Sequence, residues 1–267
     1  MHPKQLLSHY QIEPKKSLGQ NFLFDENILA QIVEAAEIEP LEPVLEIGPG
    51  LGSLTRLLAQ TNAQVTAVEL DNRFLPILQT ELAFFDNVRL IHGDILEQDL
   101  DALFDRPYKV VANVPYYITG AILRHLLSAK QKPTCLVMTV QKEVAERITA
   151  VPPQMSLLAV SIQLYGEAEI ITTIKAGAFW PRPDVDSAVI RLALFPEPLL
   201  PLAEEKAFFT LVKAGFSQKR KQLKNNLRQL GYNSSEISGI LDKAGVDGRR
   251  RAETLTRSEW IKIYKNL

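Results

Sequence analysis

Short apolar runs alternate with helical stretches between residues 44 and 149, and this alternation constrains the fold more than any other feature of the chain. Buried strands are predicted at residues 44–47, 64–68, 88–92, 109–112 and 134–140. Helices are predicted between or after them at residues 53–59, 72–82, 119–129 and 142–149. Strands and helices that alternate at this spacing form a parallel sheet, so the sequence predicts an α/β fold.

The rhythm changes after residue 149. A helix is predicted at residues 156–165, followed by two strands at residues 169–174 and 188–194 that are joined by a long Pro-containing loop. Such a pair is expected to lie antiparallel at one edge of the sheet.

The end of the chain differs from the rest in both pattern and charge. A Pro-rich linker is expected at 196–202, between a domain at 1–195 and an all-helical domain at 203–267, with helices near 204–214, 219–230, 234–244 and 258–264. Residues 203–267 hold 14 Lys and Arg against seven Asp and Glu, whereas the remaining 202 residues hold 16 against 24. This asymmetry indicates either a tail that binds a polyanion or a solvated helical surface.

Composition limits the cellular compartment and the kinds of site that the chain can hold. The single cysteine, Cys135, lies in an apolar run, where a buried and inert thiol is expected. The chain opens without an apolar signal segment and has no apolar run of about 18 residues, so no membrane span is expected. Its four histidines and one cysteine lack metal-ligand spacing, and no metal site is expected. We predict a cytoplasmic monomer.

Three features follow consecutive strands of the predicted sheet. The first strand runs into Gly48-Pro49-Gly50-Leu51-Gly52, where glycines permit a tight turn and a close approach to a ligand. Glu69 ends the second strand and can accept both ribose hydroxyls, while Asp94 ends the third and can accept from an adenine amino group beside Ile95. Each acid alone is as easily a loop carboxylate or a helix cap. Together, at the edge where such sheets bind ligands, they predict an adenosine cofactor, and S-adenosylmethionine fits best.

Asn113-Val114-Pro115-Tyr116 follows the fourth strand and suits the binding of a flat ring that carries an amino group. The Asn113 oxygen and a backbone carbonyl can accept hydrogen bonds from the amino group. Pro115 fixes the backbone direction, and Tyr116 offers a face for stacking. The same four residues also suit an ordinary turn. Their position beside a methyl donor favours the binding site.

Several stretches resemble the ribosomal RNA adenine N6,N6-dimethyltransferases, and the nearest branch is the bacterial small-subunit (KsgA/RsmA) enzymes. The resemblance runs from about Lys15 to the end of the chain. It rests on the glycine turn, Glu69, Asp94 and Asn113–Tyr116, and on the stretches 16–23, 179–187, 216–227 and 251–255. It implies a Rossmann-like methyltransferase sheet with a small C-terminal helical domain, and dimethylation of two adjacent adenines in a 3′-terminal hairpin loop of small-subunit ribosomal RNA, on an assembling 30S particle.

The resemblance also implies roles for individual residues. Asn21 and Leu23 would close over the cofactor, Gly48 and Gly50 would line it, and Asn113 would contact both cofactor and target. Phe179 would stack on the target adenine opposite Tyr116. Two positions depart from the family pattern, namely Val114, where Leu or Ile is common, and Tyr117, where Asn is common.

Basic residues near both ends of the chain are expected to hold the RNA backbone. They are Lys15 and Lys16, then Lys219, Arg220, Lys221 and Lys224 on one predicted helix, and Arg249 and Arg250. Two alternatives stay open. One is a large-subunit adenine N6-methyltransferase of the macrolide-resistance type. The other is a ribosome-assembly factor in which methyl transfer is secondary.

Overall fold

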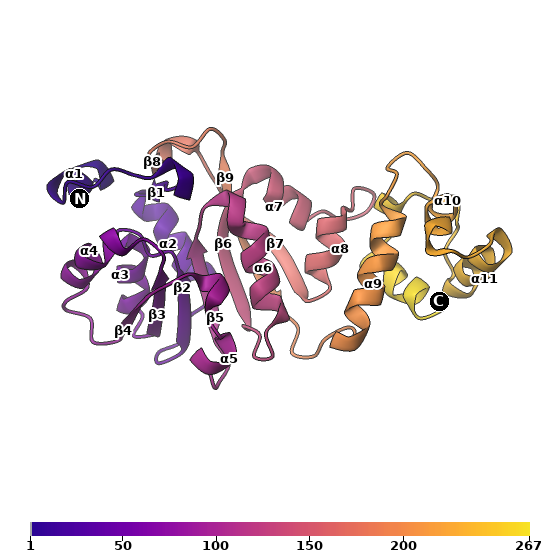
Figure 1. Cartoon of the computed structure of the whole chain (residues 1–267), viewed down its shortest axis with the longest axis horizontal. Helices are drawn as coiled ribbons and strands as arrows, with labels where there is room; N and C mark the ends of the chain where they lie inside the picture. Colours follow the sequence, from indigo (N-terminus) through magenta and orange to yellow (C-terminus); the bar gives the residue numbers. More distant parts are fainter. Residues whose placement is uncertain (1) are drawn as a thin grey trace. The chain divides into compact units, whose positions relative to one another are not determined.

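The computed structural model describes residues 2–267, with every side chain among them except that of Lys16 (Figure 1). It divides into two compact units. The first holds the described residues up to Ala145 together with Glu169–Leu194, and the second holds Glu146–Ala168 and Phe195–Leu267. No helix in the described part of the chain combines the length and the apolar character needed to span a membrane.

A seven-stranded sheet forms the centre of the first unit, in the order β4-β3-β2-β5-β6-β9-β7. The first five strands in that order run parallel, and β9 pairs antiparallel with β6. The predicted α/β class is therefore confirmed, and β9 and β7 lie together at one edge as expected. The strands are β2 (Pro43–Ile47), β3 (Gln64–Glu69), β4 (Val88–His92), β5 (Lys109–Asn113), β6 (Cys135–Gln141), β7 (Gly166–Ile174) and β9 (Ser187–Leu194).

Apolar side chains explain why these segments form a buried parallel sheet. All five residues of β2 are buried, which is typical of a central strand covered on both faces. One core packs Leu29 and Ile32 of α2 and Leu58 of α3 against Val44 and Val111. Cys135 is buried in the same core, and burial raises the pKa of its thiol. The helices before and between the strands are α1 (Pro3–His9), α2 (Glu26–Ala35), α3 (Ser53–Gln60), α4 (Leu75–Glu81), α5 (Leu100–Leu103), α6 (Thr119–Ser128) and α7 (Lys142–Ile148).

A second, two-stranded sheet was not predicted. β1 (Phe22–Leu23) pairs antiparallel with β8 (Phe179–Trp180), with Leu23 opposite Phe179. Two residues per strand are too few for a pattern of alternating side chains to be visible in a sequence. This pairing joins the N-terminal segment to the loop between β7 and β9, two parts of the chain that lie far apart in sequence.

The second unit is helical, with α8 (Leu157–Gln163), α9 (Leu202–Gly215), α10 (Leu223–Leu227), α11 (Ser234–Ala244) and α12 (Arg257–Tyr264). Trp260 is fully buried in its core. Residues 146–168, which the sequence boundary assigns to the first domain, group with these helices. The Met155 amide donates to the Glu253 carbonyl, and the Tyr165 hydroxyl donates to Glu205.

The helix predicted at residues 219–230 is wrong in its first four residues. α10 begins only at Leu223, and residues 216–222 form a loop. The buried Asn226 amide explains the loop, because its Nδ2 donates to the Gly215 carbonyl at 2.6 Å and to the Gln218 carbonyl at 3.1 Å. A side chain that satisfies the exposed carbonyls at the end of α9 turns the chain instead of continuing the helix. Lys219, Arg220 and Lys221 therefore lie on a loop.

Candidate active site

The carboxyl ends of four parallel strands meet at one edge of the sheet. Ile47 of β2 is paired with Val68 of β3 and with Ala112 of β5, and Glu69 is paired with His92. Glu69 and Asn113 are the last residues of β3 and β5. This edge is where open α/β sheets bind their ligands.

The glycine turn leaves room for a ligand beside the sheet. Gly48 and Gly50 have φ values of +69° and +57°, which favour glycine. A side-chain carbon added at Gly50 would lie 3.2 Å from the Phe22 ring, so the turn packs closely under the N-terminal segment. The Gly50 amide donates to Glu69 Oε2 at 3.0 Å, and the Asp71 amide donates to Glu69 Oε1 at 2.7 Å.

Glu69 is thus a buried carboxylate fixed by two backbone amides. Burial raises its pKa, while the hydrogen bonds from the Asp71 and Gly50 amides act in the opposite direction. Each carboxylate oxygen still has a free lone pair, so the group can accept further hydrogen bonds from paired hydroxyls.

Asp94 combines the two roles that the sequence left open. Its Oδ1 accepts from the Leu96 amide at 2.9 Å and caps a short 3-10 turn at Ile95–Glu97. Its Oδ2 has no hydrogen-bond partner among the described residues. Ile95, which is buried, forms an apolar wall next to it.

Asn113, Pro115 and Tyr116 line the same pocket. Within the described part of the chain, no hydrogen bond occupies the Asn113 side-chain amide. A 3-10 turn begins at Tyr116, and the Tyr116 hydroxyl lies 2.5 Å from the hydroxyl of Ser187, the first residue of β9. Ser187 is fully buried, so it fixes one end of the Tyr116 ring. Burial also raises the pKa of Tyr116, which keeps its phenol neutral.

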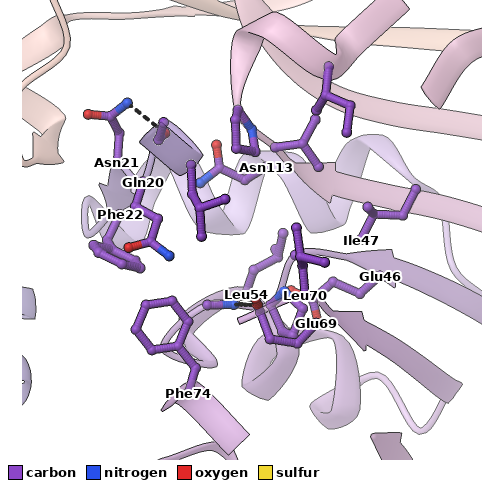
Figure 2. Close-up of a pocket in the computed structure, with 18 of the residues that line it drawn as sticks. Gln20, Asn21, Phe22, Glu46, Ile47, Leu54, Glu69, Leu70, Phe74 and Asn113 are labelled. Carbon is purple, nitrogen blue, oxygen red and sulfur yellow. Dashed lines mark hydrogen bonds between the residues drawn. The ribbon is translucent and has the colours of Figure 1, made fainter. Parts of the chain in front are cut away.

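The N-terminal segment closes the pocket from another side. Asn21 donates to the Gly19 carbonyl at 3.0 Å, and Leu23 lies against Phe179 through the β1–β8 pairing. Phe179 is only 3% exposed, so its ring is part of the pocket wall. Figure 2 shows Asn21 and Asn113 on one side of the cavity and Glu46 and Glu69 on the other.

A charged network ties this segment to the sheet. Gln20 Nε2 donates to Asp71 Oδ2 at 2.8 Å, and the Lys15 amide donates to Gln20 Oε1 at 2.7 Å. The Arg73 guanidinium contacts both Asp71 oxygens, at 2.9 and 2.6 Å, and donates to the Glu13 carbonyl. It also holds the pKa of Asp71 well below its usual range. We call Gln20, Asp71 and Arg73 the N-terminal latch.

All predicted catalytic and cofactor-binding residues line one pocket: Asn21, Leu23, Gly48, Gly50, Glu69, Asp94, Ile95, Asn113, Pro115, Tyr116 and Phe179. The sequence did not single out Glu46, Gln20, Asp71 or Ser187. Glu46 is buried in β2, and its Oε2 has no hydrogen-bond partner among the described residues. Acids that precede a glycine turn are a usable sequence signal, but the partners of the other three are distant in sequence.

The chemistry of the lining residues tests which cofactor the pocket fits. Three carboxyl groups, those of Glu46, Glu69 and Asp94, face it, while the described lining residues include no Lys, Arg or His. A phosphate-bearing cofactor needs cationic or amide-rich surroundings. A pocket whose carboxyl groups can bind hydroxyl, amino and cationic groups instead fits S-adenosylmethionine, which carries all three.

The predicted RNA-binding residues fall into two groups. Lys15 is exposed in the first unit, and the side chain of Lys16 lies outside the described residues. In the second unit, Lys219, Arg220, Lys221 and Lys224 are exposed and have no ion-pair partner among the described residues. The Leu223 and Lys224 amides donate to the Arg250 and Gly248 carbonyls, so this segment lies beside Arg249.

Arg249 and Arg250 are less free. Arg249 pairs with Asp247 at 3.0 Å. Arg250 is half-buried, with its guanidinium 2.5 Å from Glu259 and also bonded to Thr254. The geometry therefore gives Arg250 a structural contact that the sequence did not predict.

The parallel sheet, the glycine turn and the carboxylate-lined pocket beside Asn113–Tyr116 define a methyltransferase that uses S-adenosylmethionine. Residues 12–267 match the family described as ribosomal RNA adenine dimethylase. The chain belongs to this family, as its motifs predicted.

Two curated relatives cover nearly the whole chain. Ribosomal RNA small subunit methyltransferase A of Dehalococcoides mccartyi (strain CBDB1) is 43% identical over 263 residues, which is 97% of this chain and 90% of that protein. The protein of the same name from Geobacillus thermodenitrificans (strain NG80-2) is 43% identical over 276 residues, covering 99% and 94%.

Solved structures share the architecture. The crystal structure of the 23S rRNA methyltransferase ErmE has a TM-score of 0.77 at 32% identity and covers 92% of this chain and 99% of its own. A dimethyladenosine transferase from Plasmodium falciparum has a TM-score of 0.79 at 24% identity, covers 91% and 95%, and supports the fold alone.

Proposed function

We propose that this protein transfers methyl groups from S-adenosylmethionine to N6 of two adjacent adenines in a 3′-terminal hairpin loop of small-subunit ribosomal RNA. The main support is that residues Asn113–Tyr116 line the same pocket as the carboxyl groups. The choice of the small subunit is supported by 43% identity to small-subunit enzymes, against 32% to the large-subunit enzyme ErmE. We propose that the substrate is an assembling 30S particle. We also propose that the protein acts on it as a monomer in the cytoplasm.

The cofactor, when bound, supplies an activated methyl group. We assign its ribose to Glu69 and its adenine to Asp94 and Ile95, with Gly48 and Gly50 allowing close approach. Asn21 and Leu23 cover it from the N-terminal segment. Buried carboxylates held by backbone amides can bind hydroxyl and amino groups without moving, which favours precise placement.

Asn113, Pro115 and Tyr116 act on the target adenine. The exocyclic amino group of adenine is weakly nucleophilic because its lone pair is delocalised into the ring. Hydrogen bonds from this group to Asn113 Oδ1 and to the backbone next to it turn the lone pair out of the ring. They also stabilise the positive charge that develops on nitrogen. Tyr116 and the wall formed by Phe179 hold the adenine ring so that its exocyclic nitrogen points at the methyl group. The proton that the methylated nitrogen loses leaves to solvent.

The target adenine must leave its stack to reach this pocket, so the protein acts on an unpaired or flipped base. Exposed cations are suited to phosphate contacts, and here they are Lys15, Lys219, Arg220, Lys221 and Lys224. Phosphate contacts position an RNA without reading its sequence. We assign Arg249 the same role at the edge of this group. Binding through such contacts weakens steeply with salt.

One experiment tests the function. Small and large ribosomal subunits from a strain that lacks this modification are each incubated with the protein and methyl-labelled S-adenosylmethionine, and the methylated positions are mapped. We expect label at N6 of two adjacent adenines of small-subunit RNA, with less transfer as salt rises. Label confined to large-subunit RNA would support the resistance-type alternative. Tight binding to subunits without any transfer would support an assembly factor.

A further inference from the structure

Tyr117 is an exposed aromatic residue at the mouth of the pocket. The residue is 66% exposed, yet it lines the same pocket as its neighbour Tyr116. Its hydroxyl has no hydrogen-bond partner within the described part of the chain. Single exposed apolar residues need no explanation when they lie far from a site. An open aromatic ring beside a pocket for a flat base is different, because it presents a stacking surface.

The backbone that carries the Tyr117 ring is held in place, although most of the residue is exposed. Tyr117 lies in the 3-10 turn Tyr116–Ile118, closed by a hydrogen bond from the Ile118 amide to the Pro115 carbonyl. One ring edge packs on Gly19, where an added side-chain carbon would lie 3.4 Å from Tyr117 Cε1. Gly19 has a φ of +58° and is itself held by Asn21. The ring is therefore supported from one edge.

The two adjacent tyrosines face different surroundings. The Tyr116 hydroxyl is bonded to the buried Ser187, so its ring reaches inward. The Tyr117 ring stays at the exposed entrance. Consecutive Cα atoms are about 3.8 Å apart, so the two rings start close enough to serve consecutive nucleotides.

We propose that Tyr117 is a stacking platform for the base next to the one that enters the pocket, with a purine as the favoured base. This inference rests on the proposed function. A base that flips out leaves its neighbour without a stacking partner, and an exposed aromatic ring restores one. Because the two adenines take turns in the pocket, the base on the platform differs between the two positions. Tyr117 therefore influences which adenine is methylated faster.

The test compares Tyr117→Ala, Tyr117→Phe and Phe84→Ala on unmethylated small subunits. Phe84 is a matched control, because it is 93% exposed and does not line the pocket. We measure kcat and KM for subunits, the ratio of methylation at the two adenines, and the affinity for S-adenosylmethionine by calorimetry. Loss of one base stack in Tyr117→Ala should raise KM by about tenfold and change the ratio. Tyr117→Phe and Phe84→Ala should match the unmodified protein in both quantities, and all three variants should bind the cofactor normally.

Several outcomes would overturn the inference. In the first, Tyr117→Ala keeps the KM and the ratio of the unmodified protein. In the second, Tyr117→Phe loses as much as Tyr117→Ala, which would assign the effect to the hydroxyl. In the third, the affinity for S-adenosylmethionine falls while KM for subunits rises, which would indicate a structural role. Failure of the proposed function is separable, because the unmodified protein would then transfer no methyl group to small subunits.

Discussion

The Asn113 side chain is placed to act on the target amino group, because it lines the pocket and no hydrogen bond from the described residues occupies its amide. We expect Asn113→Ala to fold normally and to bind S-adenosylmethionine, while its kcat falls by about 10²–10³, the usual cost of removing one transition-state contact. Single-turnover methyl transfer to small subunits measures this. Asn266→Ala, at a half-buried site near the end of the chain that does not line the pocket, is the control. Near-normal transfer by Asn113→Ala would contradict the assignment.

Ser187 acts on the same pocket through Tyr116. Its hydroxyl lies 2.5 Å from the Tyr116 hydroxyl, and both are needed to fix the ring orientation. We expect Ser187→Ala to lower kcat by about tenfold with little change in KM, since the ring remains but loses its alignment. Tyr116→Phe should have a similar effect, and the double variant should be no worse than either alone. Additive losses in this double-mutant cycle would show that the two hydroxyls act independently.

At the level of single residues, the sequence predicted the pocket residues that lie at strand ends. It missed the residues whose hydrogen-bond partners are distant in sequence. Glu69 and Asn113 each end a strand and Asp94 lies two residues after one, so a correct strand prediction places them at one edge. Ser187 and Tyr116 are 71 residues apart, and Gln20 and Asp71 are 51 apart. No local pattern reports such a pairing, because it depends on how the β1–β8 segment and β9 fold back onto the sheet.

The N-terminal latch holds one wall of the pocket in place. The Asp71 side chain is 1% exposed and accepts from both Gln20 and Arg73. We expect Asp71→Asn to release residues 13–23, because the neutral amide presents one acceptor oxygen in place of two. Amide hydrogen exchange in this segment should speed up, and S-adenosylmethionine should bind about tenfold more weakly, since losing one hydrogen bond to a charged group costs about 1.5 kcal/mol.

Asp99→Asn is the matched control for the latch. Asp99 caps α5 through its side chain and is exposed, and asparagine caps helices about as well as aspartate. We expect this control to leave both exchange and affinity unchanged. If Asp71→Asn also leaves the exchange of residues 13–23 unchanged, the latch does not hold the segment.

The end of α9 depends on a glycine for packing. A side-chain carbon at Gly215 would lie 2.2 Å from Cη2 of the buried Trp260, which also stacks on Phe216. We expect Gly215→Ala to lower the free energy of unfolding by about 1–3 kcal/mol through overpacking. Gly239→Ala in α11 is the control, because nothing lies within 4 Å of its added carbon and alanine favours a helix. Urea unfolding measures both, and equal stability of the two variants would contradict the packing argument.

The predicted helices were correct where a long apolar pattern defined them. A prediction was wrong where a single tertiary contact fixed the start of the helix. α11 begins at Ser234 and ends at Ala244, as predicted, and its Asn233 capping box gives a local reason. The helix predicted from residue 219 fails because Asn226 bonds back to Gly215 and Gln218. Propensity alone cannot anticipate a buried amide that ends one helix and delays the next.

Charge is distributed unevenly over the whole chain. The first 202 residues carry eight more acidic than basic residues, and the last 65 carry seven more basic than acidic ones. The acidic part includes the carboxylate-lined pocket, which suits a cationic cofactor. The basic part includes the free lysines of residues 219–224, which suit a polyanion. One chain with a net charge of −1 thus offers separate surfaces to two ligands of opposite charge.

Glu46 makes the stability of the whole molecule sensitive to pH. It is fully buried in the central strand β2, and burial raises its pKa from 4.5 to about 8, with a smaller contribution from the nearby Glu69 carboxylate. At a pH below 4.5 the carboxyl is protonated in both folded and unfolded chains. Between pH 4.5 and 8 the folded protein retains a proton that the unfolded chain has released. The folded state therefore loses stability as pH rises across this window, and the loss levels off above about pH 8.

We expect Glu46→Gln to remove this dependence, because an amide has the shape of the protonated acid and does not titrate. The free energy of unfolding of Glu46→Gln, relative to the unmodified protein, should rise by a few kcal/mol, on the order expected for a raised carboxyl pKa, between pH 5 and pH 8. Urea unfolding of both proteins without cofactor, at pH steps across this range, measures the difference. Glu97→Gln, at an exposed site after β4, should show no such trend. A difference that stays flat or falls with pH would mean that Glu46 is already charged in the folded protein at neutral pH. Its unpartnered Oε2 would then lie in a far more polar environment than the core contacts of β2 indicate.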